Sequence, residues 1–299
     1  MDSSNFAALM PVALGAVMFG LGLTLTVADF ALVLRYPKAA LLALCCQLLI
    51  LPLICFGLVL TFDLTGALAV GMMLLAASPG GIAANLFSHL AGGDVALNIT
   101  LTAVNSVISV FTMPVVIALS MRHFLGTEAV VGLQLGKLAQ VVAIVLIPVA
   151  VGMVVRARYP EWASRSKKVV TLGSVVVLVA VIAGAVITEF DTLIEQGTRL
   201  LPATLLLSVC SLTIGYLVPR LFRVRRGQAI ASAMEIGIHN ATIAIAVATS
   251  VLGDQVMAVP GAVYGLVMFG PAAVAAVLFR RSGRAEEEPP VALRTGEAG

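Results

Sequence analysis

Apolar residues are gathered into long runs along this chain, and short breaks that are charged or rich in proline and glycine separate the runs. A helix that crosses a bilayer needs about 20 predominantly apolar residues. Nine runs meet this requirement, at residues 6–28, 39–60, 66–90, 95–121, 129–155, 169–188, 200–219, 227–252 and 259–279. The pattern therefore predicts an all-α integral membrane protein with nine transmembrane helices and no room for a folded soluble domain.

The composition agrees with this interpretation. Of the 299 residues, 60% are hydrophobic and 11% are charged, whereas soluble proteins are about 45–50% apolar and about 25% charged. These values exclude a water-soluble enzyme and a nucleic-acid-binding protein. The four cysteines lie inside apolar runs without a metal-binding spacing, and the sequence lacks the motifs of intramembrane hydrolases and ATP-driven pumps. We expect a protein that is not an enzyme and has no cofactor.

The distribution of charge predicts the orientation of the chain. With nine spans, 15 of the 18 Lys and Arg fall on one side of the membrane, after spans 1, 5, 7 and 9, and most acids of the connections fall on the other side. Because positive residues collect on the cytoplasmic side, we expect the N-terminus outside and the C-terminus in the cytoplasm. Segment 281–299 has the composition of a disordered cytoplasmic tail.

Two of the predicted spans are interrupted near their centres. Ser78-Pro79-Gly80-Gly81 breaks the third span, because proline lacks a backbone donor and glycine adds conformational freedom. The eighth span carries Glu235, Gly237, His239 and Asn240 at its centre. The two spans are five apart and therefore cross in opposite directions, as an inverted repeat requires. Two five-helix repeats would make ten spans, so this chain lacks the first helix of such a scaffold.

Glu235 is the one carboxylate near the centre of a predicted span. A carboxylate at that depth costs about 2.5–3.5 kcal/mol even on the lenient insertion scales, so it requires a bound cation or a proton. Several neutral polar side chains in nearby spans either hold helices together or supply oxygens to a hard monovalent cation. They are Gln47, Asn85 and a stripe on one face of the fourth span, Asn98, Thr102, Asn105 and Ser109.

The break after Gly81 also exposes the first amides of a half-helix, whose partial positive charge suits an anion. A cation-binding carboxylate beside an anion-binding helix end indicates cation-coupled transport of an organic anion.

Two motifs carry a resemblance to a known family. SPGGIAANLFSHLAGGDVALNITLTAVNS and MEIGIHNATIAIAVA, together with MFGLGLTLTVADF and VPGAVYG, resemble the bile acid:sodium symporter family over residues 12–280. The resemblance implies the nine-helix form of a ten-helix fold in which two broken helices cross. It also implies a core domain at 38–122 and 198–280 (spans 2–4 and 7–9), and a panel domain at 1–30 and 128–190 (spans 1, 5 and 6) that moves against it.

The resemblance further implies two Na⁺ sites and a substrate site. The first Na⁺ site corresponds to Asn85, Asn98, Thr102 and Glu235, with Ala84 standing where a serine is usual. The second corresponds to Gln47, Glu235, the carbonyls of Ile236 and Ile238, and His239 in place of a usual glutamine. Since an imidazole is a poor Na⁺ ligand, this second site is weak, is replaced by a proton, or uses His239 through a water. The substrate positions are Gly81, Ile82 and Asn240.

The residues predict a multi-pass transporter of the cell membrane that couples a cation to the import of an organic anion. The resemblance implies that the cation is Na⁺ and that the anion is a bile acid or a small carboxylate such as a keto or hydroxy acid or pantoate. Its partners are this anion, Na⁺ and lipid; it needs no nucleic acid and no oligomer. One alternative is a proton-coupled carrier on the same fold, using Glu235 and His239. Another is a channel or membrane sensor that binds without cycling.

Overall fold

The computed structural model describes residues 15–287 except 17, 21, 24 and 127–134. In this part the chain is helical, apart from one isolated antiparallel bridge between Gly80 and His239. The helices are α2 (Val27–Arg35), α3 (Pro37–Cys45), α4 (Leu51–Thr61), α5 (Gly66–Ala77), α6 (Ile82–Ala91), α7 (Val95–Phe124), α9 (Leu135–Arg158), α10 (Pro160–Thr188), α11 (Phe190–Leu221), α12 (Arg226–Gly237), α13 (Ala241–Ala246), α14 (Val259–Val267) and α15 (Phe269–Glu287). Two π-helical turns, η1 (Cys46–Ile50) and η2 (Val247–Leu252), and a 3₁₀ turn, η3 (Val256–Ala258), complete them.

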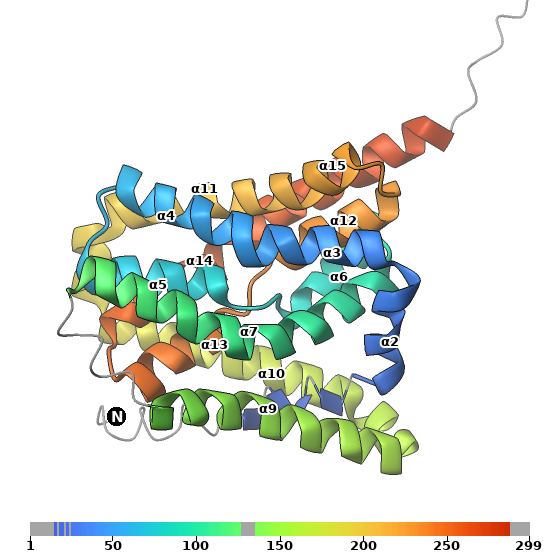
Figure 1. Ribbon diagram of the computed structural model, residues 1–299, viewed down its shortest axis with the longest axis horizontal. Helices are drawn as coiled ribbons and strands as arrows, with labels where there is room; N and C mark the ends of the chain where they lie inside the picture. Colours follow the sequence, from blue (N-terminus) through green and yellow to red (C-terminus); the bar gives the residue numbers. More distant parts are fainter. Residues whose placement is uncertain (1–14, 17, 21, 24, 127–134, 288–299) are drawn as a thin grey trace, which may run out of the picture.

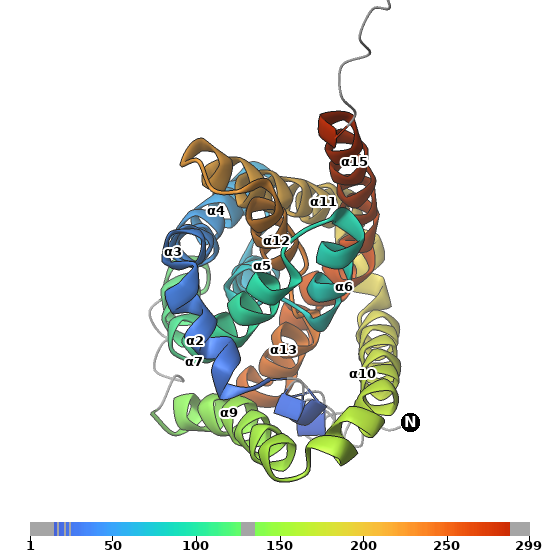
Figure 2. The ribbon, with the colours of Figure 1, turned by 90° about the vertical axis from the view of Figure 1, so that its right-hand side faces the viewer.

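The helices run side by side in layers (Figure 1). The helices α3, α4, α11 and α15 form one side, and α9 and α10 form the opposite side. Between these sides lie α5, α7, α13 and α14. Figure 2 shows the same layers from the right-hand end of Figure 1. The segments that carry the candidate site are therefore enclosed by helices.

Both interruptions that the sequence predicts are present. α5 ends at Ala77 and α6 begins at Ile82, while α12 ends at Gly237 and α13 begins at Ala241. Residues 78–81 and 238–240 are buried in the protein, which is the environment that non-helical backbone requires at membrane depth.

Several expected connections are helical instead. Residues 29–35 belong to α2, because the apolar sequence continues past residue 28, where the first span was expected to end. This helix packs against α7. α10 begins at Pro160 and α11 at Phe190, before the expected starts at 169 and 200, since charged residues outside the hydrocarbon do not prevent a helix. α15 continues to Glu287, into the segment expected to be disordered from 281; residues 288–299 lie outside the described part. About half of the first expected span, 6–28, also lies outside the described residues.

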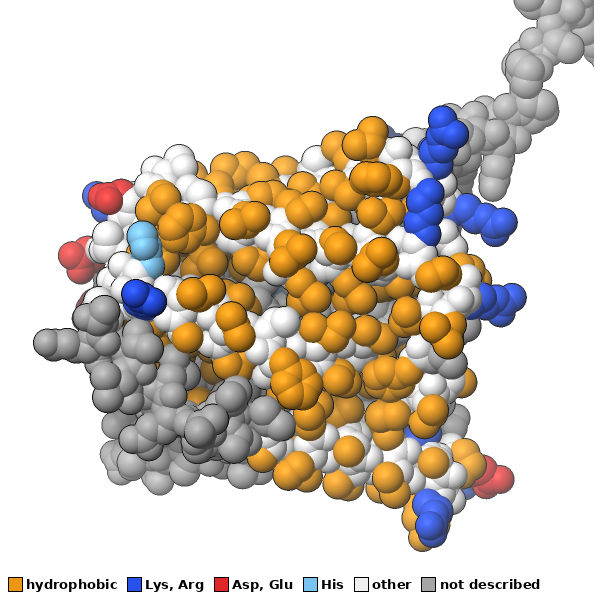
Figure 3. Space-filling model, in the orientation of Figure 1, with side chains coloured by type: hydrophobic (Ala, Val, Ile, Leu, Met, Phe, Trp, Pro, Cys, Tyr) orange, Lys and Arg blue, Asp and Glu red, His pale blue; other side chains and the backbone are white. Residues whose placement is uncertain are grey.

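Four helical runs in the described residues are long and apolar enough to cross a bilayer unaided, at 37–61, 95–124, 194–221 and 256–282. The shorter apolar helices 66–77, 82–91 and 241–252 flank the two interruptions. Figure 3 shows apolar side chains spread across the middle of one face, with charged side chains gathered at its two ends. This is the surface expected of a protein solvated by lipid.

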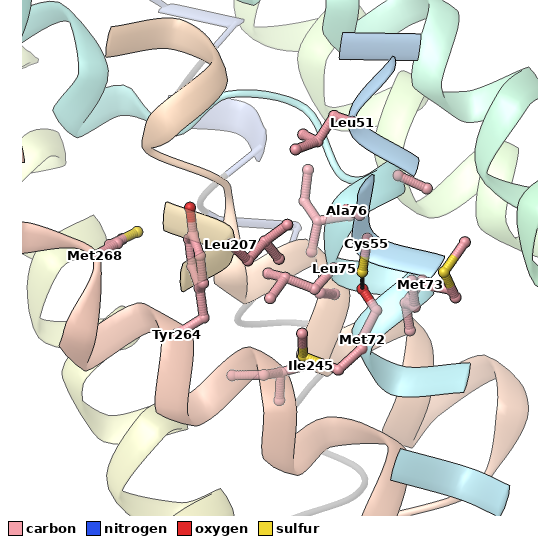
Figure 4. Close-up of a cluster of buried hydrophobic side chains, with 14 of the residues drawn as sticks. Leu51, Cys55, Met72, Met73, Leu75, Ala76, Leu207, Ile245, Tyr264 and Met268 are labelled. Atoms are coloured by element: carbon pink, nitrogen blue, oxygen red, sulfur yellow. Dashed lines mark hydrogen bonds between the residues drawn. The ribbon is translucent and has the colours of Figure 1, made fainter. Parts of the chain in front are cut away.

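The core is built from long apolar side chains of five helices. Leu51 and Cys55 of α4, Met72 and Leu75 of α5, Leu207 of α11, Ile245 of α13 and Tyr264 of α14 meet in one cluster (Figure 4). Within it, the Cys55 thiol donates to the Met72 carbonyl at 3.3 Å. This packing fixes α5, which ends at the first interruption, against α4, α13 and α14.

The helices α4 and α11 end in the same way. After Phe62 and Phe222, which have nearly equal backbone angles, Asp63 (φ 51°) and Arg223 (φ 60°) turn into the left-handed region. The next amides, of Leu64 and Val224, each return to the carbonyl five residues back at 2.9 Å. A left-handed residue other than glycine costs about 1 kcal/mol, yet both ends carry a charged side chain there.

Candidate functional site

The two interrupted segments bind each other through their backbones. The Gly81 amide donates to the Ile238 carbonyl at 2.7 Å, and the Asn240 amide donates to the Pro79 carbonyl at 2.8 Å. These bonds satisfy buried groups that neither interrupted helix can satisfy alone. The crossing therefore holds the four half-helices α5, α6, α12 and α13 together at one point.

Glu235 lies two residues before the end of α12 and is 2% exposed. Its Oε2 accepts a hydrogen bond of 2.5 Å from the Thr102 hydroxyl of α7. Its Oε1 has no hydrogen-bond partner among the described residues. The backbone amide of Gly80 and the side chain of Asn105, one helical turn after Thr102, also lie close to this carboxylate. A fully buried carboxylate with one free oxygen requires a compensating positive charge.

Other buried oxygens that the sequence assigns to a cation are likewise free. The Asn98 Nδ2 donates to the Ala231 carbonyl at 2.7 Å, which leaves its Oδ1 without a partner. The Oδ1 of Asn85 and the Oε1 of Gln47 also lack a partner in the described part of the chain. Thr102 lies on the same face of α7 as Asn98, whose carbonyl oxygen, 3.1 Å from the Thr102 hydroxyl, is the alternative acceptor of its single proton. Native proteins rarely leave buried polar atoms unpaired, so each such oxygen calls for an explanation.

The Ser78 carbonyl, at the start of the first interruption, is shared by two donors. Gln47 Nε2 donates to it at 2.9 Å, and His239 Nδ1 lies 3.3 Å away. A carbonyl only accepts, so Nδ1 carries the proton in this contact. The other ring nitrogen, Nε2, has no partner among the described residues. The His239 ring packs edge-on against Tyr264, whose hydroxyl donates to the Gly237 carbonyl at 2.9 Å.

Three further residues belong to the two expected cation sites. Ala84 and Ile236 are fully buried, and Ala84 has no side-chain oxygen to offer. The Ile238 carbonyl, expected as a ligand, already accepts from Gly81.

The positions expected to bind substrate lie at the starts of α6 and α13. Because the Gly81 amide is bound to Ile238, the next amide available at the start of α6 is that of Ile82. Asn240 caps α13, since its Oδ1 accepts from the Ile243 amide at 3.2 Å. Its side-chain NH₂ group remains as a donor.

Three features of the site were missed by sequence reasoning. The Ser78 carbonyl gives no sequence signal. Tyr264 lies in an apolar helix where its hydroxyl has no visible partner in the sequence. Gly80 is part of the recognised break, but its particular role comes from the structure, because a Cβ at this position would overlap the Glu235 carboxylate.

Gln47 lies in the π-helical turn η1, and the Leu51 amide bonds to the Cys46 carbonyl there. Pro52 cannot donate and would clash with the carbonyl four residues earlier. A π turn before it relieves this conflict, and such turns are frequent at functional sites. Pro52 was a signal that could have predicted a distorted helix beside Gln47.

Comparison with known proteins places this geometry in context. The Sodium Bile acid symporter family matches residues 11–196. The "Uncharacterized sodium-dependent transporter YocS" of Bacillus subtilis is 27% identical over 85% of this chain and 77% of its own length. The "Probable sodium/metabolite cotransporter BASS2, chloroplastic" of rice is 26% identical over 92% of this chain and 64% of its own length. The rat "Sodium/bile acid cotransporter 4" is 32% identical over 56% of this chain and 38% of its own length.

A buried carboxylate among free oxygens, a pair of crossed half-helices and relatives named as sodium-dependent transporters define the class. This is a multi-pass membrane protein of a sodium-dependent transporter family, not an enzyme. Within that class, the chain belongs to the sodium bile acid symporter family.

Proposed function

We propose that this protein imports an organic anion together with Na⁺ by alternating access across a cell membrane. The observation that carries the proposal is the group of buried oxygens without partners, one each on Gln47, Asn85, Asn98 and Glu235. A hard cation prefers oxygen ligands, and one carboxylate supplies the charge for one monovalent ion.

The first cation site combines the Glu235 carboxylate with oxygens of Asn85, Asn98 and Thr102. These residues come from α6, α7 and α12, on both sides of the crossing. A cation bound here neutralises Glu235 and joins the two interrupted segments. Binding therefore orders the crossing, and by linkage the anion strengthens cation binding to the same extent.

The second site, expected at Gln47, Glu235, Ile236, Ile238 and His239, offers less to a cation. Two N–H donors already occupy the Ser78 carbonyl, and Gly81 occupies the Ile238 carbonyl. We therefore propose one Na⁺ per cycle, with the N–H groups of Gln47 and His239 taking the place of a second ion.

The anion site lies at the starts of α6 and α13. The amide of Ile82 and the side-chain NH₂ of Asn240 are donors at two helix N-termini, whose partial positive charge favours a carboxylate. This chemistry fits a bile acid and a small keto or hydroxy acid alike, and it selects the charge of the substrate rather than its size.

Nine spans, the domain division and the orientation belong to the same proposal. We place spans 2–4 and 7–9 in a core domain and spans 1, 5 and 6 in a panel domain. The inverted repeat is supported by the reciprocal bonds of the two interruptions and by the equal ends of α4 and α11. The N-terminus is outside, because the Lys- and Arg-rich ends belong in the cytoplasm.

A proton-coupled carrier is the second candidate, and the free Nε2 of His239 favours it. A proton on Glu235 would neutralise the same buried charge without a metal ion. In that case the protein responds to a pH gradient and not to Na⁺.

The test is thermal unfolding of the purified protein in NaCl and in KCl at equal ionic strength. A ligand that binds only the folded state stabilises it by RT ln(1 + [L]/Kd), about 2.7 kcal/mol at 100 times Kd. We expect a Na⁺-specific rise in Tm that Glu235→Gln abolishes and that Asp191→Asn, at an exposed carboxylate, retains. Equal Tm values in the two salts would favour the proton-coupled carrier.

A further inference from the structure

Arginines gather where α11 ends, α12 begins and α15 passes beside them. Five of them are exposed: Arg220, Arg223, Arg225, Arg280 and Arg281. Arg226 ties these elements together, because its guanidinium donates to the Phe279 carbonyl and, at 3.0 Å, to the Ser282 hydroxyl. The five arginines therefore share one junction, at the right-hand end of the protein in Figures 1 and 3, where Lys and Arg side chains collect.

Among the side chains that the structure describes, these arginines have no acidic partner. No carboxylate pairs with Arg223, Arg225, Arg280 or Arg281 in the described part of the chain. At the equivalent end of α4 the situation is the opposite, because Asp63 forms an ion pair with Arg199 at 3.2 Å. The charge at the α11 end is therefore available to an external anion.

Arg223 adopts the left-handed backbone conformation (φ 60°) that glycine prefers. The turn itself requires no side chain at this position, since its hydrogen bonds are made by backbone groups of Arg223 and Val224. An arginine kept in a strained conformation indicates that its side chain has a use.

The surface beside the arginines is apolar. Leu221 and Phe222 are 80% and 51% exposed, and Leu278 of α15 is 59% exposed. In a membrane, the lipid chains cover these apolar side chains. The arginines beside them therefore lie at the level of the lipid headgroups. We propose that the α11–α12–α15 junction is a binding site for the phosphate headgroups of anionic phospholipids. Guanidinium groups bind phosphate in a bidentate manner, and a polybasic cluster at a membrane surface attracts anionic lipid.

The experiment compares thermal unfolding in nanodiscs of phosphatidylcholine alone and with 30% phosphatidylglycerol. The test variant carries Arg223→Gln, Arg225→Gln, Arg280→Gln and Arg281→Gln. The matched control removes the same charge from exposed residues elsewhere, with Arg35→Gln, Lys38→Gln, Arg158→Gln and Arg165→Gln. We expect phosphatidylglycerol to raise the Tm of the unchanged protein and of the control by several degrees, and that of the test variant by less than half as much. If the Tm shift with phosphatidylglycerol falls equally in both variants, the shift depends on surface charge in general, and the proposed site is wrong.

Two further measurements complete the test. Arg223→Gly relieves the strained turn and removes one charge, so we expect a higher Tm than that of the unchanged protein in phosphatidylcholine and a smaller shift with phosphatidylglycerol. An unchanged shift would contradict a role for Arg223 and for the site. Glycerol phosphate added to phosphatidylcholine nanodiscs should not reproduce the shift; if it does, the ligand is a free phosphate and the lipid assignment is wrong.

Discussion

Thr102 and Glu235 are joined by a 2.5 Å hydrogen bond between α7 and α12, and both side chains are almost completely buried. The hydroxyl orients one carboxylate oxygen and leaves the other one free. This bond makes Thr102 the residue that fixes the orientation of the Glu235 carboxylate.

Thr102→Val tests this relationship, because valine keeps the shape and loses the hydroxyl. A hydrogen bond to a charged group contributes about 1.5–3 kcal/mol, so we expect roughly 10- to 100-fold weaker Na⁺ binding. The measurement is the dependence of Tm on NaCl concentration. Thr100→Val is the matched control, since Thr100 lies on the same helix and bonds only to the Ala96 carbonyl. A loss of the same size in both variants would contradict the special role of Thr102.

Gly80→Ala should abolish the response to Na⁺ while the protein still folds. The added methyl group would overlap the Glu235 carboxylate, so the carboxylate must shift away from its present position. Overpacking of this kind costs about 1–3 kcal/mol, which lowers Tm in KCl. Binding assays with ²²Na⁺ should show at least a tenfold loss.

The control for Gly80 is Gly57→Ala in α4, where a Cβ meets open space. Alanine is favoured over glycine inside a helix by up to about 1 kcal/mol, so this variant should be slightly more stable and should bind Na⁺ normally. Normal Na⁺ binding by Gly80→Ala would show that the carboxylate has room to move without loss of the site.

The sequence alone predicted the two interruptions and the burial of Glu235, but not the contacts between the interrupted segments. Pro79 and its glycines predict a break, and Glu235 predicts a buried partner, because both are unfavourable in an uninterrupted membrane helix. The bond from Gly81 to Ile238 and the bond from Asn240 to Pro79 join residues far apart in the chain. No local pattern specifies such a pairing. The same holds for Gln47 and His239, which share the Ser78 carbonyl.

Several predicted helix boundaries were wrong, for a different reason. Apolar runs report how much of a helix lies in hydrocarbon, whereas a helix continues for as long as its backbone bonds are favourable. α10 and α15 therefore extend through charged residues that the hydropathy pattern assigned to connections.

We expect one Na⁺ to bind per protein. Glu235 is the single carboxylate at the crossing, and the Ser78 carbonyl beside Gln47 already accepts from two N–H donors. A titration of Na⁺-dependent uptake in proteoliposomes should give a Hill coefficient near 1. A coefficient near 2 in the unchanged protein would restore a second cation site.

Asn240 combines two roles that different substitutions separate. Its Oδ1 caps α13 by accepting from Ile243, and its NH₂ group is the donor that we assign to the substrate. Asn240→Asp keeps the cap and replaces the donor by a negative charge, whereas Asn240→Ala removes both. We therefore expect both variants to lose stability, Asn240→Ala by about 0.5–2 kcal/mol because the cap is lost, and Asn240→Asp because a carboxylate replaces a neutral amide at a buried position.

Anion binding should be lost in both variants. The probes are cholate and pantoate, added in NaCl, and the readout is the further rise in Tm of the unchanged protein. The repulsion between a carboxylate at position 240 and the probe makes the loss in Asn240→Asp at least as large as that in Asn240→Ala. If Asn240→Asp binds the probe that the unchanged protein binds, Asn240 only caps α13, and the anion must be held by other groups at the starts of the two half-helices.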